Sequence, residues 1–380
     1  MIDLDLTGAE VLRPDGLQDT RLSFAEGRIV ADRVGRKADL RGFLVLPGMI
    51  DLHGDAFERH VAPRRGAMKQ MHDGILATEA EIAANGISTA VLAQFVSWEG
   101  GLRGPDFAGE VFAAIRAAAP EAVTDLRAQL RFETHMLEHY DALPRWVRDW
   151  AIDYVVFNDH LPHDRLAQGK RPPRLTGQAL KAGRNPEAHF EMLLALHRNA
   201  GAVPEALDRA CAALAHLGVR MGSHDDRSAA DREDWHGRGV RIAEFPETPE
   251  AAEAARGQSD AVVLGAPNVV RGGSHKGNVS AVELVSLGLC DALASDYHYP
   301  SLRRAAFFLA DSGVADLASA WALVSSGPAR VLGLTDRGTL APGARADLVI
   351  VEAESRRVAG TLSGGRFSYL SGALAERLIG

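Results

Sequence analysis

The sequence predicts an α/β protein: a (β/α)8 barrel of the TIM type with a small flanking β-sandwich domain formed from both chain ends. Three observations predict this fold. Apolar strand-like runs alternate with helical stretches through the middle of the chain, the two ends are rich in short strands and turns, and polar residues follow many different strands. The last observation favours a barrel, because barrel active sites lie at the carboxyl ends of the strands.

Composition places the chain among ordinary soluble proteins. Of its 380 residues, 46% are hydrophobic and 24% are charged, the usual proportions for a globular domain. The net charge of −8 gives no global attraction to nucleic acid or to an anionic membrane, so any affinity for phosphate must come from a local site. We therefore expect a small-molecule substrate, no nucleic-acid partner and no membrane partner.

Cysteine usage and the absence of a targeting signal point to the cytoplasm. Cys211 and Cys290 lie far apart in apolar contexts, which favours buried reduced thiols over a disulfide bond. The first residues carry no basic region followed by an apolar stretch, and no segment reaches membrane-spanning length. A homodimer is expected only because it is the commonest oligomer.

The two chain ends share one style of sequence. Within residues 1–46, the runs 21–24 and 28–31 flank Ala25-Glu26-Gly27, a hairpin signal. Short strands and turns return in 336–380. We expect 1–46 and 336–380 to form one small β domain, with a barrel of residues 47–335 inserted between them.

The barrel prediction depends on eight strand candidates separated by helical crossovers. The strands are expected at 49–52, 87–94, 127–133, 152–158, 219–223, 240–244, 260–264 and 291–295. Helices are expected between them at 75–85, 107–118, 186–198, 204–216, 249–256 and 279–287. A doubly wound open sheet is the alternative, since strand count alone does not exclude it.

The first barrel strand ends in a His-x-Asp pair. In Met49-Ile50-Asp51-Leu52-His53-Gly54-Asp55, residues two apart on a strand point to the same face, so His53 and Asp55 can present an imidazole and a carboxylate to one point. Divalent cations accept that ligand mix. Two polar residues where a strand enters a loop are the simpler interpretation of the pair taken alone.

Other strands end in the same way. Glu133, the pair Asp159-His160, His224 and Asp296 each follow an apolar run. Taken singly, each is more often an exposed strand end or a helix cap, and Asp225 or Asp226 could cap the helix after His224. Because all of them lie at carboxyl ends of strands, we predict a metal site there.

A second set of residues indicates phosphate binding. Gly265–Asn278 follows a strand and opens a helix, and its glycines with Arg271, His275 and Lys276 suit an anion. It lacks the spacing of a Walker loop or a dinucleotide fingerprint, and a surface loop is the alternative. The basic, Pro- and Gly-rich insertion at about 161–185 has the length of a lid over an anionic substrate or of a solvated loop.

Several segments together resemble a known family. Pro47–Asp55 and Gly338–Val349 are similar to the entry and exit signatures of the amidohydrolase superfamily. Within that superfamily, 223–226, 242–248, 265–278 and 294–297 resemble the alpha-D-ribose 1-methylphosphonate 5-triphosphate diphosphatase family of the carbon–phosphorus lyase pathway. His-x-Asp replaces the superfamily's usual His-x-His, which agrees with the narrower family, and no lysine before His160 suits the carboxylated-lysine bridge of many members.

The resemblance implies a metal-dependent diphosphatase of phosphonate catabolism. One or two divalent cations are implied, zinc first and manganese, iron or nickel as alternatives, with Glu133 as the bridge and Asp296 as the general base. The implied metal ligands are His53, Asp55, Glu133, His160, His224 and Asp296. The implied substrate-binding residues are Asn268, Arg271, Gly272, Gly273, Ser274, His275 and Lys276, with Arg59, His60, Arg64 and Arg165 as second-rank phosphate contacts.

The implied reaction releases pyrophosphate from the 5-triphosphate, with attack at the α phosphorus preferred, and leaves the 5-phosphate. A cyclic amide hydrolase or deaminase on the same scaffold would use the same metal ligands but would leave the cluster from Arg271 to Lys276 without a role. A non-catalytic scaffold protein built on a barrel is the alternative from another functional class.

Overall fold

The computed structural model describes residues 2–62, 70–272 and 280–379. They form two compact units. Unit 1 comprises Met1–Leu92, Ile115–Arg127 and Ala261–Gly380, and unit 2 comprises Ala93–Ala114 and Ala128–Asp260. The sequence predicts a β domain of 1–46 and 336–380 and a barrel domain of 47–335. The two compact units have other boundaries, so these domain boundaries stay a prediction.

Eight strands form one parallel sheet in the order β15-β14-β13-β12-β11-β10-β9-β8. A parallel bridge between Gly54 and Asp296 joins its first and last strands, so the (β/α)8 barrel prediction is confirmed. The strands are β8 (Met49–Gly54), β9 (Ile87–Val96), β10 (Asp125–Glu133), β11 (Tyr154–Asn158), β12 (Arg220–His224), β13 (Ile242–Glu244), β14 (Ala261–Gly265) and β15 (Ala292–Ala294). Each coincides with one of the eight expected strands.

The barrel strands are recognisable because they are buried on both faces. Every residue of β9 is buried, as is every residue of β8 and β11. Strands covered on both faces are near-continuous apolar runs rather than alternating ones. A polar residue in such a run therefore marks the strand end or a functional position.

The helices follow the strands as the crossover pattern requires. The expected helices match α2 (Met71–Ala84), α3 (Pro105–Ala118), α7 (Pro186–Arg198), α8 (Val203–His216), α10 (Pro249–Gly257) and α12 (Ala281–Ser286). The structure adds α1 (Glu58–Val61), α4 (Leu143–Asp149), α5 (His163–Ala167), α6 (Leu175–Lys181), α9 (Ala229–Gly237), α11 (Ala266–Arg271), α13 (Ser301–Asp311), α14 (Leu317–Ala322), α15 (Ser326–Val331) and α16 (Gly372–Ile379).

Two expected loops contain helices. The basic insertion at about 161–185 forms α5 and α6, each anchored by a buried leucine (Leu166, Leu175). In the run expected to cradle phosphate with its glycines, residues 266–271 form α11. Short helices of this kind have too few turns to show a clear 3.6-residue period, and their prolines and glycines resemble loop composition.

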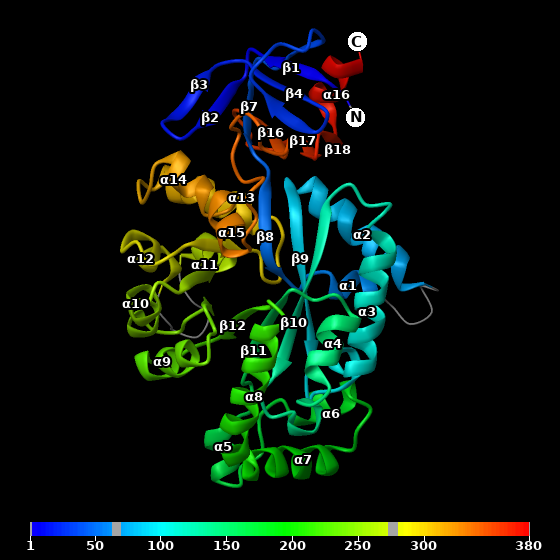
Figure 1. The fold of residues 1–380 in the computed structure, drawn as a ribbon, viewed down its shortest axis with the longest axis vertical. Helices are drawn as coiled ribbons and strands as arrows, with labels where there is room; N and C mark the ends of the chain where they lie inside the picture. Colours follow the sequence, from blue (N-terminus) through cyan, green and yellow to red (C-terminus); the bar gives the residue numbers. More distant parts are fainter. Residues whose placement is uncertain (1, 63–69, 273–279, 380) are drawn as a thin grey trace. The chain divides into compact units, whose positions relative to one another are not determined.

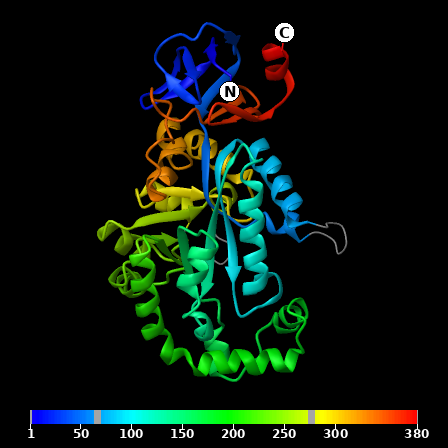
Figure 2. The same ribbon diagram turned by 45° about the vertical axis from the view of Figure 1, so that its right-hand side comes forward.

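The chain ends build two sheets in unit 1, as expected for the small β domain. The four-stranded sheet has the order β5-β4-β1-β6 and the six-stranded sheet β18-β17-β16-β7-β2-β3. Both termini lie beside these sheets, and β7 continues into β8 of the barrel (Figures 1 and 2). The strands are β1 (Leu4–Thr7), β2 (Glu10–Arg13), β3 (Gly16–Asp19), β4 (Leu22–Ala25), β5 (Arg28–Val30), β6 (Lys37–Asp39), β7 (Phe43–Pro47), β16 (Leu348–Glu352), β17 (Val358–Ser363) and β18 (Arg366–Leu370).

An apolar core joins the two sheets. Phe24 of β4 and Leu4 of β1 belong to one buried cluster with Val45 of β7 and Ile350 of β16. The expected hairpin is β4–β5, and Glu26 and Gly27 in its turn have φ of 50° and 78°. Positive φ at both central residues gives the turn whose twist matches a two-residue hairpin.

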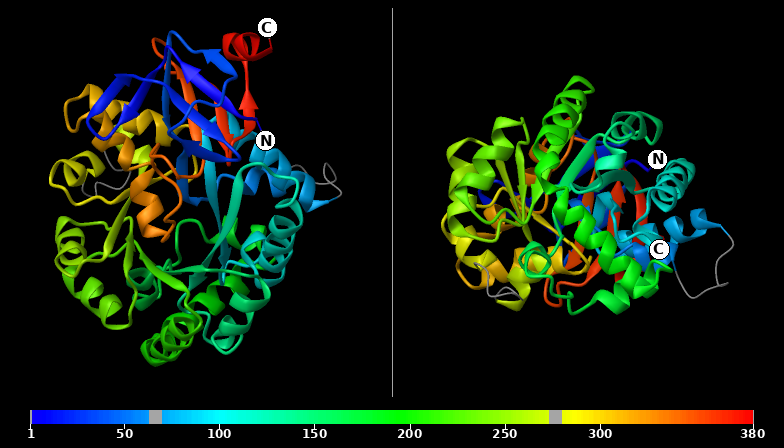
Figure 3. Two further views of the ribbon diagram at one scale, coloured as in Figure 1. Left: turned by 45° about the horizontal axis from the view of Figure 1, so that its top comes forward. Right: turned by 90° about the horizontal axis from the view of Figure 1, so that it is seen from below.

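Unit 2 contains β11, β12 and β13 with the helices that follow them along the chain. Figure 3 shows these strands in green, and α8 contacts β12 while α10 contacts β13. Across the described ranges, none of the helices is long and apolar enough to cross a membrane.

Candidate metal centre

Three strand ends carry residues with unusual backbone angles. Asp225 follows β12, Phe245 follows β13 and Asp296 lies two residues beyond β15, with φ of 61°, 56° and 56°. A residue with a Cβ avoids this left-handed region unless its surroundings hold it there, and such strained residues concentrate at functional sites. The strain marks the same edge of the sheet as the predicted metal site.

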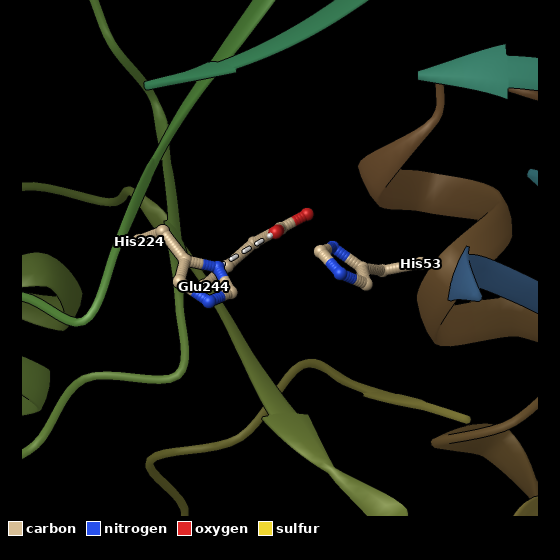
Figure 4. A group of neighbouring side chains, drawn as sticks. All are labelled: His53, His224 and Glu244. Atoms are coloured by element: carbon tan, nitrogen blue, oxygen red, sulfur yellow. Dashed lines mark hydrogen bonds and ion pairs between the residues drawn. The ribbon is translucent and has the colours of Figure 1, made fainter. Parts of the chain in front are cut away.

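In unit 2, β12 and β13 end side by side at His224 and Glu244. The two residues are register partners, and His224 Nδ1 lies 3.5 Å from Glu244 Oε2 (Figure 4). Arg131 Nη2 donates to His224 Nε2 over 3.0 Å. The imidazole therefore lies between a carboxylate and a guanidinium.

Glu244 is a functional candidate that the sequence analysis did not name as a ligand. Its side chain is fully buried and accepts hydrogen bonds from Gln129 Nε2, at 2.9 Å, and from the Tyr154 hydroxyl. Burial and the adjacent carboxylate raise the pKa of Tyr154 well above its ordinary value, so the hydroxyl remains a donor. The sequence feature that could have identified Glu244 is its position, because it ends an apolar strand as Glu133 does.

Arg131 is a second residue that the sequence analysis missed. It lies two positions before Glu133 on β10, so the two side chains share a face of the strand. Its guanidinium stacks 3.8 Å from the centre of the Phe95 ring, and the residue is 4% exposed. The signal for it in the sequence was an arginine between Leu130 and Phe132 in a run expected to form a strand.

Glu133 and His160 meet at the ends of β10 and β11, as predicted. Glu133 is buried, and its carboxylate accepts from the Trp98 Nε1 at 3.3 Å and from the His160 backbone N at 3.2 Å. His160 Nδ1 also contacts Glu133 Oε1. His160, His224 and Asp225 each offer a donor atom, all within 4.8 Å of one another.

Unit 1 holds the remaining predicted ligands, His53, Asp55 and Asp296. The Asp296 N–H donates to the His53 carbonyl and the Asp55 N–H donates to the Asp296 carbonyl, both over 2.9 Å. The first and last barrel strands therefore bring these three residues together. His53, which Figure 4 also draws, is fully buried.

The carboxylate of Asp51 supports this corner of unit 1. It accepts from the Ser295 N–H at 2.9 Å and from the Ser295 hydroxyl at 2.5 Å. Burial raises the pKa of Asp51, although these hydrogen bonds oppose the effect. The Asp51 carboxylate is fully buried, as His53 is.

The donor set fits a divalent cation. In unit 2, donor atoms of His160, His224 and Asp225 lie within 4.8 Å of one another, and Glu133 and Glu244 are buried beside them. Buried carboxylates are costly unless a charge partner compensates them. Imidazole with carboxylate suits zinc, manganese, iron or nickel. The residues present thus match the cofactor that the sequence predicts.

The structure describes some of the residues predicted to contact phosphate, which stay predictions. Arg271 is exposed on α11 and donates to Asn268 Oδ1, at 2.6 Å, and to the Tyr297 hydroxyl. Gly272 caps α11 with φ of 72°. Gly273, Ser274, His275, Lys276 and Arg64 lie outside the described residues.

Three of the second-rank phosphate contacts lie among the described residues and stay predictions. Arg59 and His60 both contact the carboxylate of Glu81, His60 at 2.6 Å, so their charge is partly compensated within the chain. Arg165 is exposed on α5.

Comparison with known proteins identifies relatives along most of the chain. Residues 112–369 match the model of the amidohydrolase family. The alpha-D-ribose 1-methylphosphonate 5-triphosphate diphosphatase of Escherichia coli K12 is 34% identical over 348 residues, which cover 88% of this chain and 89% of the relative.

Solved structures agree on the fold. An amidohydrolase has a TM-score of 0.67 at 14% identity and covers 98% of this chain and 100% of its own. The β-aspartyl dipeptidase of Fervidobacterium islandicum AW-1 has a TM-score of 0.64 at 14% identity, with 98% of both chains covered. At such identities the similarity shows the architecture alone.

Proposed function

This chain belongs to the amidohydrolase family and is a hydrolase, and we propose that it converts alpha-D-ribose 1-methylphosphonate 5-triphosphate to the 5-phosphate and pyrophosphate. The observation that carries this proposal is the 34% identity to the Escherichia coli diphosphatase over 88% of the chain. The strand-end carboxylates and imidazoles supply the chemistry that such a hydrolysis needs. A cytoplasmic location is part of the proposal.

The ligands of the metal centre are proposed as the sequence predicts them. The proposed ligands are His53, Asp55, Glu133, His160, His224 and Asp296, since each lies at the carboxyl end of a barrel strand or within two residues of it. Asp225 and Glu244 join them as candidate ligands. A bound divalent cation, zinc first, supplies a water of lowered pKa and neutralises phosphate charge.

The other roles in the proposed reaction, proton acceptance and phosphate binding, belong to side chains of this chain. Asp296 accepts the proton of the attacking water. The water oxygen bonds to the α phosphorus while the bond from that phosphorus to the oxygen bridging to the β phosphorus breaks, so pyrophosphate leaves and the 5-phosphate stays on the ribose. Arg271, with the run to Lys276, binds the β and γ phosphates and offsets the charge of the leaving group.

The test offers the zinc-loaded full chain the ribose 5-triphosphate in water enriched in oxygen-18. Phosphorus-31 NMR should show pyrophosphate as the product, and mass spectrometry should find the label in the ribose 5-phosphate. Oxygen-18 found in pyrophosphate instead would show that water attacks the β phosphorus. Efficient ring opening of a cyclic amide without triphosphate hydrolysis would favour the amide hydrolase instead, and no turnover by a protein that retains no metal would favour a scaffold.

A further inference from the structure

Unit 2 contains a second cluster of histidines that the proposed reaction does not use. His135 follows β10, Asp159 follows β11 and His163 begins α5. His163 Nε2 lies 3.1 Å from His135 Nε2 and 3.2 Å from Asp159 Oδ2, and the third side of the triangle, from His135 Nε2 to Asp159 Oδ2, is 3.4 Å. Three metal-type donor atoms thus converge on one point.

The size of this triangle matches one face of a zinc tetrahedron. Zinc binds imidazole nitrogen and carboxylate oxygen at about 2.0–2.1 Å, so neighbouring ligand atoms lie about 3.3–3.4 Å apart. Two imidazoles and a carboxylate also favour a borderline cation such as zinc over magnesium, which prefers oxygen ligands.

The other ring nitrogen of His163 is held by a third histidine. His163 Nδ1 lies 2.8 Å from Nδ1 of His197 on α7. When His163 donates this Nδ1 proton, its Nε2 keeps a lone pair that points into the triangle. Metal-binding histidines commonly donate their second ring N–H in this way, which fixes tautomer and ring orientation.

The cluster also has the charge and position of a ligand site. The His135 side chain is 5% exposed. The three residues line a pocket of about 380 Å³ whose wall also includes Asp225, Asp231 and other carboxylates. A cation in this pocket would therefore lie close to several carboxylates.

Asp159 and His160 are neighbours in sequence but have different contacts. Asp159 belongs to the histidine cluster, whereas His160 contacts Glu133 at the proposed metal centre. The pocket reaches from the cluster to His224 and Asp225, so an ion in the cluster would border the same cavity as part of that centre.

We propose that His135, Asp159 and His163 form an additional site for a divalent transition-metal ion, with zinc preferred. The remaining coordination position would take water or an anionic oxygen of a molecule in the pocket. The competing interpretation is a metal-free trio joined by one shared proton.

The number of metal ions bound per full chain distinguishes the proposed metal site from the metal-free trio. Protein stripped with a chelator is reloaded with zinc, passed through gel filtration and analysed by mass spectrometry for metal per chain. His163→Asn and His135→Asn should each lose one equivalent relative to wild type. His216→Asn, which removes an exposed histidine at the end of α8, should lose none.

Two further measurements separate this site from the proposed hydrolytic centre. In His224→Asn, cobalt should still give the visible bands of tetrahedral Co²⁺, and His163→Asn should remove those that remain. His197→Leu should weaken zinc binding about 10–100-fold while His197→Gln, which keeps an acceptor, stays near wild type. A wild-type zinc count equal to that of His163→Asn, or equal retention of magnesium and zinc, would overturn the proposal whether or not the protein is a diphosphatase.

Discussion

At the scale of single residues, the left-handed positions after the barrel strands connect backbone strain to chemistry. Asp225, Phe245 and Asp296 adopt a positive φ that costs a residue with a side chain on the order of 1 kcal/mol. Asparagine and aspartate tolerate this region better than other residues because their short polar side chains bond locally. A substitution at these sites therefore changes the stability of the backbone conformation as well as the charge.

Asp296 offers a substitution that separates the two effects. Asp296→Asn keeps a residue suited to a φ of 56° but removes the carboxylate that accepts the proton, so kcat should fall about 10²–10⁴-fold. The urea midpoint should stay close to wild type, whereas Asp296→Ala should lower it as well. Metal content measured in parallel separates the two proposed roles of Asp296, since loss of metal reports its role as a ligand. An unchanged kcat in fully metal-loaded Asp296→Asn would contradict its role as the base.

The two cysteines should differ sharply in reactivity. Cys211 is buried on α8, and burial raises the pKa of its thiol to about 12. Because the thiolate is the reactive form, labelling of Cys211 at pH 8 should be negligible in the folded protein and should rise only as the pH approaches 12. Cys290 is partly exposed.

Iodoacetamide labelling followed by peptide mass spectrometry measures this difference. At pH 8 the native chain should carry label on Cys290, and both cysteines should be labelled in urea. Equal labelling of both thiols in the native state would show that α8 opens readily.

At the scale of elements, α9 is anchored beneath the end of β12 by Arg232. This arginine is fully buried, and it donates to Ser223 Oγ at 2.7 Å and to Asp226 Oδ2 at 3.1 Å. Its other terminal nitrogen lies 3.3 Å from Asp260 Oδ2. Asp226, which the sequence offered only as a helix cap, is therefore part of a buried ion-pair network next to His224 and Asp225.

Loss of Arg232 should destabilise the protein strongly. Arg232→Met leaves Asp226 buried without its cation and removes one partner of Asp260, which Arg241 and His236 still contact. The free energy of unfolding should therefore fall by about 3–5 kcal/mol. Urea denaturation followed by circular dichroism measures the change.

Arg209→Met is the matched control, since Arg209 forms an exposed pair with Glu205 on α8. Exposed pairs contribute about 0–1 kcal/mol. A small effect of Arg232→Met would mean that Asp226 and Asp260 become protonated or solvated at little cost.

The elements also show how far the sequence predicts this structure. All eight barrel strands were predictable, most plainly β8, β9 and β11, which are buried on both faces and largely apolar. α5 and α6 were not, since five- and seven-residue helices take their stability from packing rather than from a repeated pattern. Glu244 was missed for a related reason: β13 has only three residues, so its end is a weak signal.

The candidate site was partly predictable for the same physical reason. Glu133, His160 and His224 lie at the ends of β10, β11 and β12. These strands are consecutive in the chain and neighbours in the sheet, so their ends lie close together. His163 and His197 come from helices that the strand-end rule does not cover. Their meeting with His135 depends on tertiary packing, which no local pattern encodes.

At the scale of the whole molecule, closure of the barrel depends on contacts between residues far apart in the chain. Asp51 and Ser295 are separated by 244 positions, and their hydrogen bond is buried. Beside it, the Gly54–Asp296 bridge joins β8 to the segment that follows β15. The strands that carry His53 and Asp296 are thus fixed to each other by few but buried polar contacts.

Ser295→Ala tests how much this closure contributes to stability. The change removes the hydroxyl that donates to Asp51 Oδ2 and leaves a buried carboxylate oxygen with one donor fewer, so the free energy of unfolding should fall by about 1–3 kcal/mol. The urea midpoint should drop with little change in the denaturant slope, since the surface exposed on unfolding is the same. Ser312→Ala, at an exposed serine that ends α13, should change the midpoint by far less. An equal, small effect of both changes would mean that the apolar packing of the strands closes the barrel without help from Asp51, and the strand ends that carry His53 and Asp296 would then keep their positions through the backbone bridge alone.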